Sequence, residues 1–343
     1  MVLYLGLLLF SFLFNSFLII PFIDFLYKLD FRRREQKTRD FLNKRTKIFD
    51  KFHRKKAGTP VGGGILILVT VSVLYFLLLP SLRLMGVYIH SAYSLSEELN
   101  VLFFTFIGFA LLGFYDDLRK FFGHTKKDFF GLRMRHKFFL QLLLAFIISG
   151  LLFFNLKISF IYIPFWGILR LGWWYLPFAV LVIVFFANAF NITDGLDGLS
   201  AGLLMIFLFA FWFLSFNQLD TPLSVFIALW LGGVLAFLYF NIYPARIMLG
   251  DVGALSFGAT MAVIGLLLGK IVAFLVIGAP FIIEAFASLL QILSKKFRKK
   301  KLFPVAPFHL WLQKRGWEES KIVMRAWLAG ITFAIFGLWL AAM

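Results

Sequence analysis

The chain has 343 residues, of which 61% are hydrophobic and 48 are phenylalanine, and its formal net charge is +18. A water-soluble core of this size does not need so much apolar sequence, so the composition excludes a soluble globular protein and predicts an integral membrane protein. The absence of cysteine from the sequence excludes disulfides and thiolate metal sites.

The apolar runs are long and continuous rather than alternating, which favours helices over a β-barrel. We predict an all-α, polytopic membrane protein with about ten transmembrane helices. The first run lacks a basic start and is too long for a signal-peptide core, so it is expected to be retained. Helix breaks or tilts are expected in the short third span and near Gly269 and Lys270. The predicted spans are about 2–25, 61–81, 100–115, 138–155, 175–192, 198–217, 222–241, 253–270, 271–293 and 322–342.

The positive charges are concentrated in three loops. Of the 35 Lys and Arg residues, 29 lie in 28–56, 116–137 and 294–321. With ten spans these loops share one side, which the positive-inside rule makes cytoplasmic, so both termini are expected on the outer side. This distribution argues against a nucleic-acid partner, and topology together with attraction to anionic headgroups explains most of the charge, including the run 295–301.

No internal repeat or Gly/Ser linker divides the chain, so residues 1–343 are treated as a single transmembrane catalytic domain. Its cytoplasmic loops are expected at about 28–60, 116–137, 192–198, 242–253 and 294–321.

Acidic residues are scarce, so those at the ends of apolar segments are informative. Asp116 and Asp117 end the third predicted span. Asp194 and Asp197 follow the fifth span, and Asp251 precedes the eighth. All five fall at predicted cytoplasmic helix ends. Carboxylates that converge repel one another unless a cation holds them, and oxygen ligands suit Mg²⁺, which commonly bridges one or two carboxylates to substrate phosphates. The pattern therefore predicts a magnesium-dependent site for phosphate chemistry.

Cationic residues beside these carboxylates can neutralise phosphate oxygens that a metal does not reach, which together describes a diphosphate site. They are Arg119, Lys120, Lys126, Lys127 and Lys137. Gly250 and Gly253 flank Asp251 at a helix start, where they let backbone N–H groups approach a phosphate. Each motif alone has a simpler explanation, such as a helix cap, a local ion pair or glycine packing. Only their co-occurrence favours the site.

Two further polar residues lie within the ninth predicted span. Glu284 and Gln291 are seven residues apart and share one helical face. A buried pair between helices is the simpler interpretation, and Gln291 is also a candidate substrate-binding residue.

Five motifs carry a family resemblance. They are KAGTPVGGGILIL (56–68), GFYDDLRK (113–120) with GLRMRHKFFLQ (131–141), NAFNITDGLDGLSAG (188–202), NIYPARIMLGDVGALSFG (241–258) and APFHLWLQKRGWEESKIVMRAWL (306–328). In order and spacing the chain resembles the polyprenyl-phosphate N-acetylhexosamine-1-phosphate transferases. The "GTP" and "GW-E" segments favour the phospho-N-acetylmuramoyl-pentapeptide transferase branch over relatives that use UDP-GlcNAc.

The resemblance implies a ten-helix enzyme of the bacterial cell membrane with outward termini and a cytoplasmic active site. The implied reaction transfers phospho-N-acetylmuramoyl-pentapeptide from UDP to undecaprenyl phosphate, giving lipid I and UMP in the first membrane step of peptidoglycan synthesis. Mg²⁺ is the implied cofactor. The implied partners are these two substrates and membrane lipid, with no nucleic acid, and a homodimer is left open.

The resemblance also implies roles for individual residues. Asp116 and Asp117 match the aspartate pair thought to act on the lipid phosphate, and Asp251 matches a magnesium ligand. Asp194 and Asp197 match the acidic loop near metal and nucleotide, and which of them binds the metal is left open. The other site candidates are Lys56, Thr59, Lys120, Lys137, Asn188, Asn191, Asn241, Gly250 and Gln291 for substrate binding, and His309 for catalysis.

The chain departs from the family pattern at two places. The family usually has three consecutive histidines where this chain has His309-Leu310-Trp311, and it usually has Phe at the position of Met248. These departures affect the uracil-stacking face, for which Trp311 is an alternative aromatic surface. Three other functions are kept open: a UDP-GlcNAc sugar-1-phosphate transferase, a transporter or proton-coupled channel, and a non-catalytic scaffold. Direct attack and a covalent intermediate are both compatible with the sequence.

Overall fold

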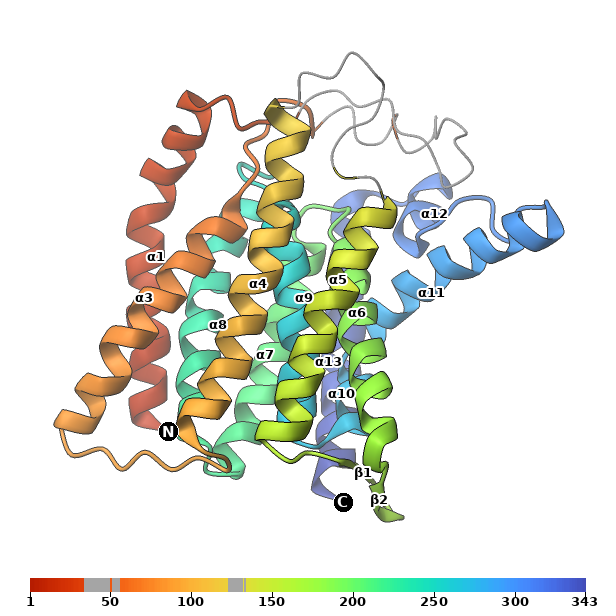
Figure 1. Ribbon diagram of the computed structural model, residues 1–343. Coiled ribbons are helices and arrows are strands. Elements are labelled where there is room, and N and C mark those ends of the chain that lie inside the picture. Colours follow the sequence, from red (N-terminus) through yellow and green to blue (C-terminus); the bar gives the residue numbers. More distant parts are fainter. Residues whose placement is uncertain (34–49, 51–55, 123–131, 133) are drawn as a thin grey trace.

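The computed structural model describes residues 1–33, 50, 56–122, 132 and 134–343, and these form a helical bundle (Figure 1). Within the described ranges, nine helices are long and apolar enough to cross a membrane, and a bent pair raises the total to as many as ten. The all-α, polytopic prediction is confirmed, and the chain has the pattern of a multi-pass membrane protein.

The helices are α1 (Val2–Lys28), α3 (Gly63–Leu84), α4 (Leu95–Phe122), α5 (Met134–Gly150), α6 (Tyr175–Thr193), α7 (Leu199–Asn217), α8 (Thr221–Asn241), α9 (Gly250–Leu267), α10 (Ile271–Ile277), α11 (Ala279–Leu293), α12 (Phe308–Lys314) and α13 (Glu319–Ala342). Short turns extend them: η2 (Leu151–Asn155) after α5, η3 (Gly172–Trp174) before α6 and η4 (Ser294–Arg298) after α11. An antiparallel hairpin of β1 (Phe160–Ile163) and β2 (Gly167–Arg170) pairs Phe160 with Arg170.

Helices α7, α8 and α9 form the centre of the bundle. They are apolar around their whole circumference, as buried helices are, and 89% of the membrane-length window of α8 and of α9 is buried. Trp230 of α8 packs edge-on against Phe106 of α4 and Phe257 of α9. By contrast, α1, α5 and α13 lie at the periphery, with 28% of the corresponding window buried.

The contact between α4 and α9 positions the acidic motifs. A Cβ at Gly113 of α4 would lie 2.2 Å from the backbone oxygen of Asp251, so only glycine allows the two helices to approach this closely. The last turns of α4 therefore lie beside the first turn of α9. Asp116 and Asp117 are brought next to Asp251 in this way.

Two predicted spans differ from the structure. The third is neither short nor broken: α4 is one helix of 28 residues, and Glu97 and Glu98 in its first turn suit the positive end of the helix dipole. The ninth is not one straight helix, because α10 and the helix that follows it are bent by 73°. The break lies at Gly278, and Pro280 lies in the first turn of α11. Proline lacks a backbone N–H, which is tolerated there because the first N–H groups of a helix have no intrahelical partner.

The two ends of the chain lie at the same end of the bundle, on the side of the β-hairpin and opposite α12 (Figure 1). This arrangement agrees with an even number of crossings. That both termini face outward stays a prediction.

Candidate active site

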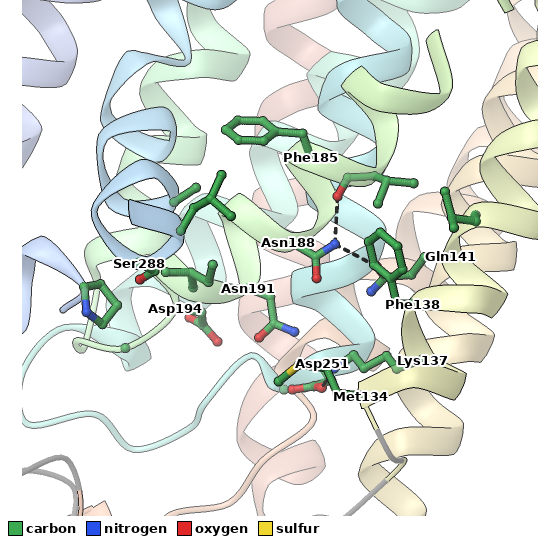
Figure 2. Close-up of a pocket in the computed structure, with 18 of the residues that line it drawn as sticks. Met134, Lys137, Phe138, Gln141, Phe185, Asn188, Asn191, Asp194, Asp251 and Ser288 are labelled. Atoms are coloured by element: carbon green, nitrogen blue, oxygen red, sulfur yellow. Dashed lines mark hydrogen bonds and ion pairs between the residues drawn. The ribbon is translucent and has the colours of Figure 1, made fainter. Parts of the chain in front are cut away.

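A cavity of about 1570 Å³ opens where α4, α5, α6 and α9 meet at the α12 end of the bundle. Its polar end is lined by the end of α4, the start of α9 and the loop between α6 and α7. From there it continues along an apolar wall supplied by α5, α6 and α11, as far as Trp173. Figure 2 shows Asn191, Asp194 and Asp251 with their polar groups turned toward the same space.

One group of charged residues lies at the polar end of this cavity, and all of its members except Asp116 line it. We call it the open cluster: Asp116, Asp117, Lys120, Lys137 and Asp251. The Asp251 carboxylate accepts from Lys120 Nζ at 2.8 Å and also from Lys137 Nζ. Lys137 Nζ lies 2.9 Å from Asp116 Oδ2 as well. The helical spacing of α4 brings Lys120 to both aspartates of the pair, at 3.3 Å each. Three carboxylates thus share two ammonium groups.

The two adjacent aspartates differ in what they face. Asp117 lines the cavity, and its Oδ2 accepts from the backbone N–H of Val252 at 3.1 Å, in the first turn of α9. Asp116 does not line the cavity, and its Oδ1 accepts from Leu132 N at 2.6 Å. A Cβ at Gly250, which has a φ of +84°, would lie 2.9 Å from Asp117 Oδ2. Glycine at this position leaves room for the carboxylate.

Asp194 lies in the loop after α6 and also lines the cavity. Burial raises the pKa of its carboxyl to about 6, against the opposing effect of a 2.5 Å hydrogen bond donated by Ser200 Oγ. On α6, Asn188 donates to Gln141 Oε1 at 2.7 Å, and Asn191 faces the cavity one turn nearer to Asp194. Because burial disfavours the ionised form of this carboxyl, a cationic ligand at the cavity would stabilise it.

A second group of charged residues is mostly buried, although Asp197 also lines the cavity. We call it the closed cluster: Lys56, Asp197 and Glu319. Lys56 Nζ donates to Asp197 Oδ1 at 2.7 Å, to Glu319 Oε1 at 2.5 Å and to Gly195 O at 3.1 Å. Asp197 Oδ2 accepts from Ala245 N at 3.0 Å, and its N–H donates to Glu319 at 2.7 Å. Every donor position of Lys56 and both carboxylate oxygens of Asp197 therefore have a partner.

His309 is fixed by Glu284 of α11. The Glu284 carboxylate accepts from the His309 backbone N–H at 3.1 Å and lies 3.0 Å from His309 Nδ1. The other side of the ring faces Gly195, where a Cβ would lie 2.5 Å from Nε2. His309 borders the cavity and is almost wholly buried. The geometry gives it one set orientation next to the loop that carries Asp194.

Of the remaining candidates, Asn241 lines the cavity, whereas Gln291 and Thr59 lie outside it. The Asn241 side chain accepts from Gly198 N at 3.0 Å and donates to Ile247 O at 2.9 Å, so it joins two loops at the cavity edge. The Gln291 amide binds the backbone of Leu302 and Phe303 and does not line the cavity. Thr59 does not line it either.

Comparison with known proteins identifies the family. The family model "Glycosyl transferase family 4" matches residues 99–269, a range that includes all five aspartates. A phospho-N-acetylmuramoyl-pentapeptide-transferase of Borrelia garinii subsp. bavariensis is 35% identical over 309 residues, covering 83% of this chain and 82% of the relative. That of Acetivibrio thermocellus is 36% identical over 293 residues, covering 84% and 83%. That of Bacillus velezensis is 32% identical over 291 residues, covering 84% and 86%.

The chain belongs to the phospho-N-acetylmuramoyl-pentapeptide transferase family. As a member of it, the protein is a transferase. The predicted family resemblance is confirmed. The match extends over most of each relative, so it is not limited to the aspartate motifs.

Three residues at or beside the transferase cavity were not predicted. Arg33 lines it, and burial lowers the pKa of its guanidinium while Asp194, Asp197 and Asp251 oppose that shift. Gln141 also lines it, and a glutamine within an apolar span was a signal that could have found it. Glu319 completes the closed cluster from 263 residues away along the chain from Lys56, and no sequence signal links these two.

Other predicted residues of the transferase lie outside the cavity or outside the described ranges. Arg119 stacks on the ring of Tyr115, 5.9 Å from its centroid, and does not line the cavity. Trp311 stacks with Arg315 at 4.1 Å and does not line it either, whereas Met248 does. Lys126 and Lys127 lie outside the described residues.

The donor set at the cavity suits a magnesium ion that is shared with substrate. Among the described residues, no three His, Asp or Glu side chains are grouped closely enough to hold a metal by themselves. Asp251 and Asp194 nevertheless both line the cavity, with the amide of Asn191 beside them. Mg²⁺ typically takes one or two carboxylates and completes its shell with waters and substrate phosphates. The residues present fit this mode of binding.

Proposed function

We propose that this protein transfers phospho-N-acetylmuramoyl-pentapeptide from UDP-N-acetylmuramoyl-pentapeptide to undecaprenyl phosphate in the bacterial cell membrane. The products are lipid I and UMP. The observation that carries the proposal is one cavity whose charged end continues into a long apolar wall. Such a cavity suits a reaction between a diphosphate and a phosphate at the end of a polyprenyl chain. The names of the relatives supply the donor and the acceptor.

The apolar wall accommodates the acceptor chain. Leu142 and Phe146 of α5, Leu181 and Phe185 of α6, and Leu289 of α11 line it. Burying a polyprenyl chain against these side chains is favourable at about 25 cal/mol per Å² of apolar surface. A chain laid along α6 brings its phosphate to the charged end, beside Asp117 and Asp194.

Asp251 and Asp194 are the residues that would hold Mg²⁺, and the ion would supply charge neutralisation on the donor diphosphate. Asp197 is assigned a different task, because both of its oxygens already have partners in the closed cluster. Lys120 and Lys137 border the same space and bind phosphate oxygens that are not otherwise neutralised. Arg33 adds a third cation whose planar guanidinium suits a phosphate.

Asp117 is the member of the aspartate pair that meets the acceptor. Its carboxylate faces the cavity and is held by Val252 N and Lys120, so it can orient the incoming phosphate and accept its proton. Asp116 supports it from behind by fixing Lys137. One diphosphate bond breaks as a similar one forms, so alignment and charge neutralisation matter more than a strong base. Direct attack by the phosphate and prior attack by Asp117 both use this alignment.

The chain acts as one domain with the charged end of the cavity at the cytoplasmic face. The nucleotide donor is water-soluble and the acceptor is held in the bilayer, so a site at helix ends on that face reaches both. The basic loops of the sequence support this orientation through the positive-inside rule.

The test is UMP release by the purified protein with Mg²⁺ and undecaprenyl phosphate. We expect release with UDP-N-acetylmuramoyl-pentapeptide and none with UDP-GlcNAc. Release only with UDP-GlcNAc would move the protein to the neighbouring branch of sugar-1-phosphate transferases. No release with either donor would remove the enzymatic proposal.

A further inference from the structure

The end of α11 carries an unusual density of positive charge. After the 73° bend, α11 leans out of the bundle, as Figure 1 shows. It ends in residues 294–301, which we call the basic tip. Six of these eight residues are Lys or Arg. The site described above uses none of them.

The basic tip is a turn that is fixed by side-chain hydrogen bonds. The Gln291 amide binds Leu302 and Phe303, accepting at 3.0 and 2.9 Å and donating at 2.9 Å, so the returning chain is fastened to α11. Ser294 Oγ donates to Lys300 O at 3.0 Å, and Lys299 reverses the chain with a φ of +54°. The cations therefore sit on a defined loop that projects from the bundle.

The four cations at residues 298–301 are solvent-facing, and within the described part of the chain no carboxylate is paired with them. Residues 296–301 are all exposed. Across the ranges that the structure describes, no carboxylate forms an ion pair with Arg298, Lys299, Lys300 or Lys301, whereas Lys56, Lys120 and Lys137 are all paired. A cluster of this kind attracts anions strongly, and it would repel itself without them.

The helix that carries the tip presents apolar side chains outward. Four apolar side chains of α11 are 39–46% exposed: Ile283, Phe286, Leu290 and Leu293. Phe297 in the tip is 73% exposed. Apolar side chains along α11 and cations at its end are typical of a membrane-surface segment. In such a segment the apolar side chains lie among acyl chains and the cations lie among headgroups. The ligand that matches both parts is a lipid with a phosphate headgroup.

We propose that the basic tip is a binding surface for the phosphate-bearing headgroups of anionic membrane lipids. Ser288, Leu289 and Ile292 of the same helix line the apolar wall of the cavity. The helix that carries the tip therefore also supplies part of the wall of the cavity that we assign to the acceptor lipid. The binding itself does not depend on the proposed reaction.

The experiment compares a tip variant with a matched control in phosphatidylcholine nanodiscs that contain phosphatidylglycerol as the probe. The tip variant is Lys299→Gln, Lys300→Gln, Lys301→Gln. The control is Lys314→Gln, Arg315→Gln, Lys321→Gln, which removes the same charge from exposed residues at the end of α12 and the start of α13, at the same end of the bundle. Native mass spectrometry counts the phosphatidylglycerol molecules that stay bound, and no substrate is present.

At low salt we expect roughly a fivefold loss of phosphatidylglycerol affinity per removed tip charge, on the order of 100-fold for the tip variant. The control should retain the wild-type affinity within a few fold. Equal affinities of wild type and tip variant, or an equal loss in the control, would overturn the proposal.

A second measurement uses the unmodified protein. High salt screens exposed charges, so it should lower wild-type binding to the level of the tip variant and leave the tip variant nearly unchanged. Wild-type binding that does not respond to salt would contradict the proposal even if the tip variant failed to fold. A protein that binds phosphatidylglycerol but releases no UMP would support lipid binding at the tip and contradict only the proposed function.

Discussion

The open and closed clusters both combine lysines with carboxylates and differ in what surrounds them. In the closed cluster, Lys56 is 7% exposed and each of its donors ends on a protein oxygen, so no position is left for a ligand. In the open cluster, Lys120 and Lys137 crowd onto Asp251 at the border of a cavity. The closed cluster holds backbone segments together. The open cluster can exchange its internal partners for a metal and phosphates.

The charge balance of the two clusters sharpens this contrast. The open cluster has three carboxylates and two ammonium groups, and the closed cluster has two carboxylates and one. Removing one carboxylate leaves either cluster balanced, whereas removing a cation leaves buried carboxylates unpaired. Substitutions should therefore separate the clusters: activity should depend on the open one and stability on the closed one.

The largest effect on activity is expected for Asp251→Asn. The variant loses the carboxylate that we assign to the metal, and we expect kcat to fall by at least about 100-fold. Thermal stability should hold, because Lys120 and Lys137 keep Asp116 and Asp117 as partners. A variant with a wild-type rate in the UMP assay would show that the metal is held elsewhere.

The closed cluster is tested by comparing Lys56→Met with Glu319→Gln. Lys56→Met leaves Asp197 and Glu319 buried without a cation, which should cost about 3–5 kcal/mol of unfolding free energy. Glu319→Gln leaves Lys56 and Asp197 balanced and should cost about 1–2 kcal/mol. Denaturation in detergent measures the unfolding free energy of both variants. A larger loss in Glu319→Gln than in Lys56→Met would contradict the structural role of the closed cluster.

The pH dependence of activity tests Asp194. Its carboxyl has a pKa of about 6, so it gains a proton as the pH falls through that value, and kcat/KM should fall with it. Ser200→Ala removes the hydrogen bond that favours the ionised form, so the acid limb should move upward by about one pH unit. An unmoved limb in the pH profile would mean that another group titrates there.

A smaller effect is expected at His309. Glu284→Gln weakens the contact that orients the imidazole, and we expect about a tenfold loss of kcat with KM little changed. The matched change Gln291→Glu, two turns along α11, alters a residue that contacts only the returning chain and should leave kcat within about twofold. Equal losses in the two variants would show that α11 responds as a whole rather than through His309.

The smallest effect is expected for Trp311→Ala. Trp311 lies outside the cavity and stacks on Arg315, so the KM for the UDP donor should stay within about twofold of wild type. A large rise in KM would place the uracil-binding face on α12 and revise the border of the cavity.

What could be predicted from the sequence depended on how local the signal was. The aspartates stand next to long apolar runs, and the bilayer limits where the ends of such runs can lie, so Asp117, Asp194 and Asp251 could be placed together. Arg33 belongs to a basic stretch that topology alone explains, and it reaches the cavity because the chain around it pairs with residues 58–61. A basic residue in such a loop can serve topology or line the cavity, and composition alone does not distinguish these two roles.

Pairings across long separations could not be predicted. Lys56 and Glu319 are 263 residues apart in the sequence, and nothing in either motif indicates that Lys56 donates to Glu319. The bend in the ninth span had a local signal, Gly278 followed two residues later by Pro280, but the Gly269–Lys270 pair was the more visible interruption. Which oxygens of Asp197 are already used was equally invisible, since their partners are backbone and lysine groups from other elements.

The most direct test of the account is the binding of Mn²⁺, a spectroscopic substitute for Mg²⁺ that accepts the same oxygen ligands. Electron paramagnetic resonance reports free Mn²⁺ in the presence of the UDP donor, measured against a protein-free baseline. We predict that the wild type and Glu319→Gln remove free Mn²⁺ from solution alike and that Asp251→Asn does not. Binding by Asp251→Asn at the wild-type level would contradict the assignment of the open cluster as the metal and diphosphate site.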